Sequence, residues 1–431
     1  MDTKKVYDIV GIGIGPFNLG MAALADGIEN LQCAFIDKQP EFNWHPGMMI
    51  PGTSLQVPFY ADLVTVVNPQ SKYSFLNYLK HKKRLFRFAI HENNFISRRE
   101  YNDYCRWVAG QLNSLHFGYA CNAVYYDGTS KLYVVSITDT RNGRIDMMRC
   151  KHLVIGVGTI PYIPECAAGV KHPLVFHSAE YLKFKDAVLE KKSISIVGSG
   201  QSAAEIYYDL LNHSSSFKEL RWFTRSERFF PMEYSKLSLE MTSPDYIDHF
   251  YGLSSQQKIA TLTKQDMLFK GINFSLINSI YDRLYDQQYE TKDCKPGLLS
   301  NCELHGLKVC EDGSIKLGFL HIELEESFSV CTDAVILATG YRNHLSFIVE
   351  SAEGVLKWNS KNRFIIKRNY SINTNEDIFV QNMDLYSHGF TSPDLGMGPY
   401  RNATILNSIL GFEHFEMEKN IAFQTFGIPK V

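Results

Sequence analysis

Two glycine-rich segments of the 431-residue chain have the residue types and spacing that hold the phosphates of a dinucleotide. The first, Gly13–Asn18 (GIGPFN), follows the short apolar run Val6–Val10, and the second, Gly198–Ala203 (GSGQSA), follows Ser193–Val197. A glycine turn between a buried strand and a helix offers backbone N–H groups and the positive end of the helix dipole to a pyrophosphate. Two such sites in one chain predict that a nicotinamide passes hydride to a flavin.

The first segment is followed by the remaining parts of a dinucleotide unit. Its glycines allow a tight turn and a close approach of the pyrophosphate, Pro16 suits the first turn of a helix, and Asn18 stands where a third glycine is usual. A second apolar strand, Leu31–Ile36, ends in Asp37, about 20 residues after the glycines, where an acid meets a ribose hydroxyl. The alternative is a tight packing turn between a strand and a helix, but the whole order of elements favours a nucleotide site.

The second segment predicts a different nucleotide. The strand after it, Glu219–Thr224, ends in Arg225, with Arg228 close by and no acid at that place. An arginine there accommodates a 2′-phosphate, which an acid would repel. The first unit is therefore predicted to bind FAD and the second NADPH; the alternative is that Arg225 is a solvated surface charge.

The elements that must position these segments alternate between strands and helices. A capping box at Ser97 predicts the start of an amphipathic helix. Residues 230–300 mix aromatic and polar side chains and predict a small, mostly helical insertion, with helices at 254–270 and 275–288. The buried strand at 333–340 is expected to return to the first sheet, so that Gly340 and the tail reach the flavin. Further strands are predicted at 119–126, 131–138, 146–157, 306–309, 315–322 and 328–331.

These elements together predict an α/β fold with two Rossmann-like dinucleotide-binding domains and a small, mostly helical substrate domain. The FAD-binding domain is expected to be discontinuous, made of residues 1–160 and 330–431. The NADPH-binding domain is expected at 161–229 and 301–329, with the substrate-binding insertion at 230–300.

Composition narrows the class of protein and its partners. Hydrophobic residues make up 45% of the chain and charged residues 21%, which is typical of globular proteins. The net charge of −2 gives no reason to expect a nucleic acid or an anionic membrane as partner. We find no apolar run of about 18 residues and no signal peptide before the first strand, so we expect a cytoplasmic protein without a membrane span.

The positions of the nine cysteines exclude the flavin disulfide reductases, a class of redox enzymes that also has two nucleotide-binding units. A flavin disulfide reductase needs a close cysteine pair just beyond its first unit, whereas Cys33 has no neighbouring cysteine before Cys105. No pair of cysteines has CxxC spacing and their number is odd, so we expect reduced thiols and no metal site.

Beyond these patterns, the chain resembles the microbial N-hydroxylating flavin monooxygenases of siderophore biosynthesis, which act on lysine, ornithine or aliphatic diamines. The resemblance runs through nearly the whole chain and is most specific in GPFNL, WHPGM and ATGY. The segments that carry it are Gly13–Leu19, Trp44–Met48, Asp62–Thr65, Ser74–Leu79, Gly198–Ala203, Ala338–Tyr341 and His388-Gly389.

The resemblance implies FAD, NADPH, O2, a C4a-hydroperoxyflavin as oxidant, no protein nucleophile, and often a homotetramer. It implies that FAD is held by Gly13, Gly15, Pro16, Phe17, Asn18, Asp37, Lys38, Trp44, His45, Gln56, Gly340 and Leu395. It implies that NADPH is held by Gly198, Ser199, Gly200, Gln201, Ser202, Glu205, Arg225, Asn273, Ala338 and Tyr341. The resemblance implies that Gln56 lies near the flavin and the nicotinamide and that Asn273 contacts both the substrate and the nicotinamide; the alternatives are a simple loop hydrogen bond and a helix cap.

The substrate prediction rests on departures from that family. Members that use lysine or ornithine carry a lysine in place of Ala61, which pairs with the substrate carboxylate, and ornithine users carry an asparagine near Leu239. Without those groups a buried carboxylate lacks a partner, which favours putrescine or cadaverine. Asp394 or Glu240 is expected to hold the distal ammonium, unless Asp394 only caps the next turn. The alternatives are an L-lysine N6-hydroxylase, an L-ornithine N5-hydroxylase, or a flavin redox sensor without turnover.

Overall fold

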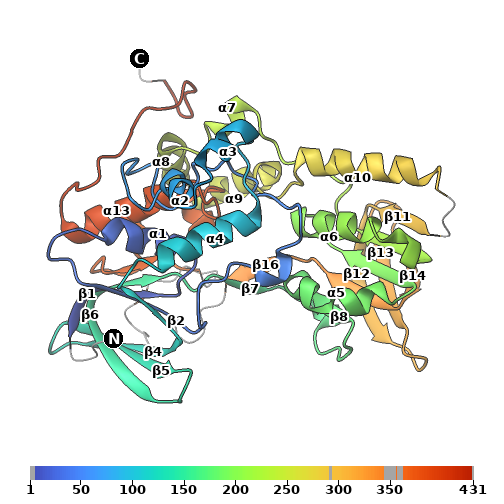
Figure 1. Ribbon diagram of the computed structural model, residues 1–431, viewed down its shortest axis with the longest axis horizontal. Helices are drawn as coiled ribbons and strands as arrows, with labels where there is room; N and C mark the ends of the chain where they lie inside the picture. Colours follow the sequence, from blue (N-terminus) through green and yellow to red (C-terminus); the bar gives the residue numbers. More distant parts are fainter. Residues whose placement is uncertain (1–4, 291–293, 344–355, 357–362, 430–431) are drawn as a thin grey trace.

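The amino-terminal strand lies in the middle of a seven-stranded sheet, with the order β3-β2-β1-β6-β5-β4 and with β17 paired to β6 (Figure 1). The computed structural model describes residues 5–290, 294–343, 356 and 363–429. Neighbours are parallel from β3 to β6 and between β17 and β6, whereas β4, β5 and β6 are antiparallel. The strands are β1 (Val6–Ile12), β2 (Cys33–Asp37), β3 (Leu115–Phe117), β4 (Tyr119–Asp127), β5 (Leu132–Asp139), β6 (Ile145–Ile155) and β17 (Ile378–Val380).

Helices from both ends of the chain cover this sheet. Helix α1 follows β1 directly, has Pro16 in its first turn as predicted, and packs against α13 near the carboxyl end of the chain (Figure 1). Ser97 caps α4 by accepting a hydrogen bond from the Glu100 N–H. The helices of this unit are α1 (Pro16–Ala25), α2 (Phe75–His81), α3 (Leu85–His91), α4 (Arg98–Ala109), α12 (Leu385–His388) and α13 (Gly398–Leu410).

A second sheet has five parallel strands in the order β11-β10-β9-β15-β8. A three-stranded antiparallel sheet packs on it, with the Phe223 and Phe319 rings stacked 4.2 Å apart. The strands are β8 (Val175–His177), β9 (Ser193–Val197), β10 (Glu219–Phe223), β11 (Lys295–Leu299), β12 (Cys302–Val309), β13 (Ile315–His321), β14 (Glu326–Thr332) and β15 (Ala334–Leu337); the helices are α5 (Tyr181–Leu189) and α6 (Gln201–Leu211).

The strand expected to return to the first sheet belongs to the second, so that prediction is wrong. β15 pairs with β8 and β9, and the Asp333 carboxylate fixes its start by accepting the N–H groups of Lys192 and Ser193 at 2.9 Å each. The chain returns to the first sheet later, through β17. Between the two sheets, β16 (Tyr341–Asn343) pairs antiparallel with β7 (Thr159–Pro161). The boundary expected at 330 therefore lies near 340.

The insertion after β10 is mostly helical, as predicted. Its first residues pair with the segment just before α10, because the Met232 N–H donates to the Ile272 carbonyl at 2.7 Å and the Ile272 N–H donates to the Phe230 carbonyl at 3.0 Å. Helix α10 packs against α6 of the second unit (Figure 1). The helix expected at 254–270 is shorter, since α9 ends at Lys264 and a 3₁₀ turn, η5 (Asp266–Leu268), follows. The other helices are α7 (Lys236–Leu239), α8 (Pro244–Gly252), α9 (Ser255–Lys264) and α10 (Phe274–Gln287).

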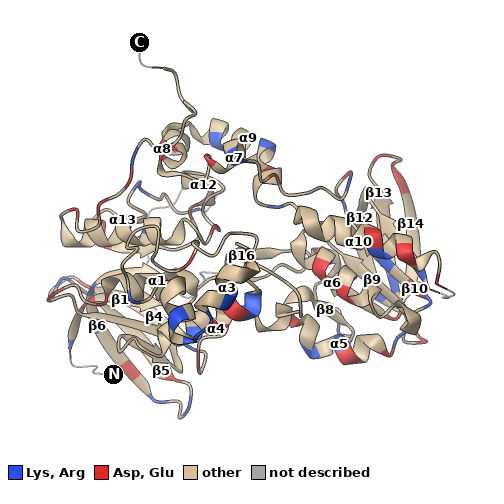
Figure 2. Ribbon diagram, turned by 45° about the horizontal axis from the view of Figure 1, so that its top comes forward, with Lys and Arg blue, Asp and Glu red and all other residues tan. Residues whose placement is uncertain are grey.

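Charged side chains of both signs are spread over the two units, in keeping with the small net charge (Figure 2). Within the described ranges, no helix is long and apolar enough to cross a membrane. The same ranges contain no group of three or more His, Cys, Asp or Glu residues arranged to hold a metal ion.

Candidate active site

The first glycine turn is built for the close approach of a phosphate. Gly13 has φ = +90°, and a side chain there would lie 2.3 Å from the Gly156 carbonyl oxygen, so β1 passes into the turn directly against β6. Gly15 faces open space, with no atom within 4 Å of the position a Cβ would take. Helix α1 begins immediately after Gly15, and its first N–H groups lack partners within the helix. An anion such as the FAD pyrophosphate fits this place.

Asn18 explains how the turn works without its third glycine. The side chain is buried, and its Nδ2 donates to the Gly13 carbonyl at 2.8 Å and lies 3.4 Å from that of Ile12. Asn18 therefore ties α1 to the turn before it. Asp37, at the end of β2, accepts a hydrogen bond from the Ile14 N–H at 2.7 Å, which places its carboxylate beside the turn, as a ribose-binding acid requires.

The second glycine turn opens into a cavity of about 920 Å³. A side chain at Gly198 would lie 2.1 Å from the Ala338 carbonyl oxygen. The backbones that follow β9 and β15 are therefore in close contact there, and only glycine fits. Gly198, Ser199, Gly200, Gln201 and Ser202 all line the cavity, together with Arg225, Ala338, Gly340 and Tyr341. The cavity is large enough for a dinucleotide, and Arg225 is the exposed cation at its β10 side.

The loop with Trp44 and His45 belongs to the first unit and contacts the second. Gly47 packs so closely on the second unit that a side chain would lie 1.9 Å from the Ala179 carbonyl oxygen. The His45 ring lies edge-on to Tyr341, with centroids 5.8 Å apart, and Tyr341 lies 5.1 Å from His177. Gly340, expected on the FAD side, accepts hydrogen bonds from the Tyr162 N–H and pairs with the His177 ring at 2.9 Å. Its contact with FAD stays a prediction.

A polar network joins the three parts of the protein beside the larger cavity. Gln201 Oε1 accepts from the Asn273 N–H at 2.8 Å and from Gln56 Nε2 at 3.4 Å, while its Nε2 donates to Glu205 at 2.9 Å. Glu205 is buried and forms an ion pair with Arg98 at 2.7 Å. Burial raises the pKa of Glu205, and Arg98 offsets part of this. Glu205 thus orients Gln201 and does not itself line the cavity.

The Asn273 side chain caps helix α10. Its Oδ1 accepts from the Ser275 N–H at 3.0 Å and from the Ser275 hydroxyl at 2.7 Å. This is the capping role considered from sequence, and the position next to Gln201 still brings the residue near the larger cavity. A contact between Asn273 and substrate or nicotinamide stays a prediction.

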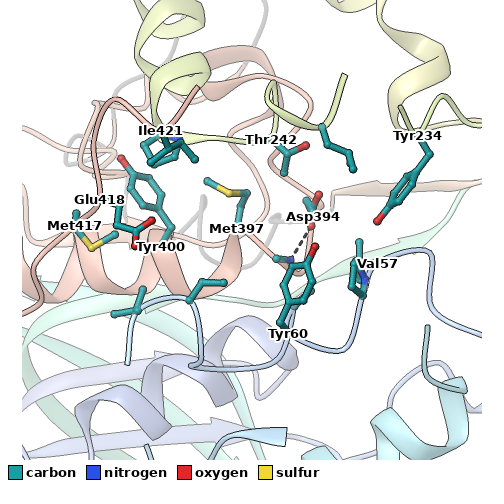
Figure 3. Close-up of a pocket in the computed structure, with 17 residues that line it drawn as sticks. Val57, Tyr60, Tyr234, Thr242, Asp394, Met397, Tyr400, Met417, Glu418 and Ile421 are labelled. Carbon is teal, nitrogen blue, oxygen red and sulfur yellow. Dashed lines mark hydrogen bonds between the residues drawn. The ribbon is translucent and has the colours of Figure 1, made fainter. Parts of the chain in front are cut away.

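A second, smaller cavity of about 260 Å³ lies between the first unit, the insertion and the tail (Figure 3). Residues that are adjacent in sequence line the two cavities, since Gln56 lines the larger one and Val57 the smaller one. Among the 17 described residues that line it, none is lysine or arginine. Besides Val57, the lining residues are Pro58, Tyr60, Ala61, Val66, Val67, Tyr234, Leu239, Thr242, Pro244, Asp394, Gly396, Met397, Tyr400, Met417, Glu418 and Ile421.

Ala61 and Asp394 reach this cavity from two fixed turns. The buried Asp62 carboxylate holds the first turn by accepting the N–H groups of Thr65 and of Phe75 in α2, each at 2.7 Å. The second turn is held by buried Arg401, which donates to the Ser392 carbonyl at 2.5 Å. Two rigid supports therefore set the distance between the positions of Ala61 and Asp394.

Of the two acids that line the cavity, Glu418 is exposed and Asp394 is partly buried. Its Oδ1 accepts the Gly396 N–H at 2.7 Å, the dashed line in Figure 3. Burial raises the pKa of Asp394, although the Gly396 N–H and Arg401 favour its charged form. Burial, with Tyr60 and Asp394 nearby, raises the pKa of Tyr234 to about 12, so the Tyr234 hydroxyl stays a neutral donor near the acid.

Comparison with known proteins decides the family. A family model described as L-lysine 6-monooxygenase/L-ornithine 5-monooxygenase matches residues 5–343. The chain belongs to this family. A putrescine N-hydroxylase from Shewanella oneidensis is 46% identical over 425 residues, covering 98% of this chain and 84% of that protein.

Solved structures agree with that membership. The FAD-bound structure of DfoA, the cadaverine monooxygenase of the desferrioxamine pathway in Erwinia amylovora, is 42% identical, with a TM-score of 0.96, covering 99% of this chain and 100% of that one. An ornithine N-hydroxylase from Kutzneria, with reduced FAD, NADP+ and L-ornithine, is 25% identical, with a TM-score of 0.86, covering 94% and 99%. The two Rossmann-like units are confirmed, and this monooxygenase uses FAD and NADPH.

The predicted substrate residues of this monooxygenase separate into two groups. Ala61, Leu239 and Asp394 come together in the smaller cavity. Glu240 does not line it, because its carboxylate accepts the N–H groups of Phe423 at 2.9 Å and Gln424 at 3.1 Å. The expectation that Glu240 holds the distal ammonium is therefore wrong. On the FAD side, Lys38 is exposed, and Leu395 is partly buried against the core of the first unit.

Sequence reasoning missed the residues that the carboxyl-terminal tail contributes to the monooxygenase. Met417, Glu418 and Ile421 line the smaller cavity from a segment without helix or strand. No periodicity or motif marks such a segment. Tyr60 was within reach of sequence analysis, since it directly precedes Ala61 in a segment already singled out.

Proposed function

We propose that this monooxygenase N-hydroxylates one primary amine of an aliphatic diamine, putrescine or cadaverine, for hydroxamate siderophore biosynthesis. The observation that carries the proposal is the charge of the smaller cavity. Its described lining contains Asp394 and Glu418 and no cationic side chain. The site is therefore suited to a cation without a carboxylate.

The same observation argues against an amino acid as substrate. Lysine and ornithine carry an α-carboxylate, which needs a cationic partner when it leaves water. Ala61 is buried in the wall, where members that use amino acids carry a lysine. An unpaired buried carboxylate costs several kcal/mol in effective terms, roughly a hundredfold or more in affinity. A diamine avoids this cost.

A diamine also uses what the cavity offers. Its methylene chain packs against apolar groups such as Val57, Leu239 and Met397, and its distal ammonium pairs with the Asp394 carboxylate. Asp394 is fixed by the Gly396 N–H and by the turn that Arg401 holds, so little side-chain entropy is lost when it binds a cation.

The cofactor sites fit their groups, and the chain's part in the reaction is to bind, orient and exclude water. Gly13, Gly15 and the start of α1 would hold the FAD pyrophosphate through backbone N–H groups, with Asp37 on the ribose; bound FAD would take a hydride from NADPH and pass the electrons to O2, which supplies the hydroxylating oxygen. Gly198, Gly200 and Arg225 hold NADPH in the larger cavity. Gln56 lines the larger cavity next in sequence to Val57 of the smaller one, which suits it to hold the nicotinamide end beside the amine.

The reacting nitrogen must be the neutral amine, since it attacks with its lone pair. An alkyl ammonium with a pKa near 10.4 is only about one part in a thousand neutral at pH 7.4. An apolar cavity closed on several sides disfavours the charged form and raises that fraction. Val57, Val67 and Met397 are among the apolar side chains that line the smaller cavity.

The function is tested by adding amines to the purified enzyme with FAD and NADPH. We expect NADPH consumption to rise on adding putrescine or cadaverine, with hydroxylamine formed in step. Hydroxylamine from lysine or ornithine at equal rates supports the amino acid alternatives. No product from any amine, with FAD bound and reduced, supports a redox sensor.

We further propose a cytoplasmic homo-oligomer, with a tetramer as the expected size. No disulfide joins the described cysteines, and NADPH is a cytoplasmic reductant. Helix α10 and the residues after it expose large aromatic groups, with Phe274 65%, Tyr281 68% and Tyr289 76% accessible, as an assembly surface does. Light scattering of the holoenzyme tests the size, and a monomer at micromolar concentration refutes it.

A further inference from the structure

The segment that follows α13 runs along the substrate insertion as an ordered strap, here defined as residues 417–424. Its approach is fixed at Asn407, whose Oδ1 accepts the N–H groups of His414 and Phe415 at 2.9 Å and whose Nδ2 donates to the Phe415 carbonyl at 2.8 Å. Phe415 is buried against the core of the first unit. The strap therefore leaves the first unit from a fixed point.

Two carboxylates of the insertion hold the strap by its backbone. Asp245 accepts the N–H groups of residues 420, 421 and 422 at 2.9, 2.8 and 3.0 Å. Glu240 accepts those of residues 423 and 424 at 2.9 and 3.1 Å, and the Gln424 side-chain amide at 2.9 Å. These bonds lower the pKa of Glu240, so it is ionised at neutral pH. Five consecutive N–H groups thus donate to two acids that face one segment.

The clamped segment is also a wall of the smaller cavity. Met417, Glu418 and Ile421 line it from the strap, while Thr242 and Pro244 line it from the insertion, between the two clamping acids in sequence (Figure 3). In Figure 3, Met417 and Glu418 lie beside Tyr400, on the other side of Met397 from Asp394. The acids that hold the strap therefore also set the position of this wall.

We propose that the strap is part of the amine site and that Asp245 and Glu240 are positioning residues for it. The proposal rests on the proposed diamine hydroxylation and adds a specificity-determining wall to it. A closed strap brings apolar Met417 and Ile421 to the side of the cavity that lies beyond Met397 from Asp394, and it limits the access of water to the cavity. An open strap leaves the flavin and nicotinamide sites unchanged, because neither acid lines the larger cavity.

The test compares the full-length holoenzyme with the double variant Asp245→Asn/Glu240→Gln. Each amide keeps one acceptor oxygen and replaces the other with a donor that opposes the strap N–H groups. We expect the KM for putrescine to rise about tenfold or more, as loss of charge-assisted hydrogen bonds implies, and the rate of flavin reduction by NADPH to stay within about twofold. The matched control is Glu416→Gln, an exposed acid of the tail outside both cavities, which leaves both values unchanged.

Hydrogen exchange of the strap peptide supplies a readout that needs no turnover. We expect residues 420–424 to exchange about tenfold faster or more in the double variant than in the wild type. Unchanged exchange overturns the clamp. Faster exchange with an unchanged KM overturns the strap as a wall of the amine site. If the double variant lacks FAD or unfolds, Glu240→Gln alone carries both measurements. If the wild type hydroxylates no amine, the proposed function fails, while the exchange result still decides the clamp.

Discussion

Replacing Asp394 by asparagine removes one of the two carboxylates that line the cavity, without removing the turn that carries it. The asparagine Oδ1 still accepts the Gly396 N–H, which the aspartate accepts at 2.7 Å, and Arg401 still holds the Ser392 carbonyl. The shape of the wall is therefore kept, and what changes is the partner of the distal ammonium.

The magnitude follows from the loss of one charge-assisted interaction in a largely desolvated place. Such an interaction contributes about 1.5–3 kcal/mol, and about 1.4 kcal/mol is a factor of ten, so kcat/KM for putrescine should fall roughly 10- to 150-fold. Because Asp394 has a raised pKa, putrescine use by the wild type should also weaken as the pH falls through that pKa, where the carboxyl takes up a proton. The Asp394→Asn variant should lack this pH dependence.

The assay measures hydroxylamine from putrescine and from 1-aminobutane, which has the same reacting end and no distal ammonium. The ratio of kcat/KM for putrescine to kcat/KM for 1-aminobutane cancels the effect of ionisation at the reacting amine, which the two substrates share. We expect Asp394→Asn to lower kcat/KM for putrescine and to leave that for 1-aminobutane within about threefold, since the lost charge has no partner in the monoamine. Equal losses with both substrates would refute the assignment and place Asp394 at the reacting nitrogen.

Three further substitutions test other parts of the site. Arg225→Ala should raise the KM for NADPH about tenfold or more and leave that for NADH nearly unchanged, because only NADPH has the 2′-phosphate; equal effects contradict the contact. Ala61→Lys should raise the KM for putrescine about tenfold or more by like-charge repulsion, with flavin reduction intact, and a normal KM contradicts the placement. Glu205→Gln should lower the free energy of unfolding by about 3 kcal/mol in a denaturant titration, since it leaves Arg98 largely buried (14% exposed) without its partner, and a loss under about 1 kcal/mol contradicts that.

The local elements could be predicted from the sequence because short-range signals determine them. The glycine turn at Gly13, the helix that Pro16 opens and the cap at Ser97 all lie where the pattern placed them. The membership of a strand in one sheet or another is a different matter. Ala334–Leu337 is apolar throughout and suits the middle of either parallel sheet, and the contact that decides is between Asp333 and a chain segment about 140 residues away.

The site residues show the same division. Ala61, Leu239 and Asp394 were found through departures from a family pattern, and the fold brings them to one cavity. Glu240 follows Leu239 in sequence, but at the end of α7 it faces the tail instead of the cavity. The strap itself has no periodicity, since carboxylates of another segment satisfy its N–H groups. Pairing of that kind leaves no signal in the strap's own sequence.

The central claim is that the cavity selects a diamine over an amino acid, and a comparison of specificity constants tests it most directly. We predict that kcat/KM for putrescine or cadaverine, measured as hydroxylamine formed with saturating NADPH, exceeds that for L-lysine and L-ornithine about tenfold or more, a difference of about 1.4 kcal/mol. Equal or better use of lysine or ornithine would contradict the account.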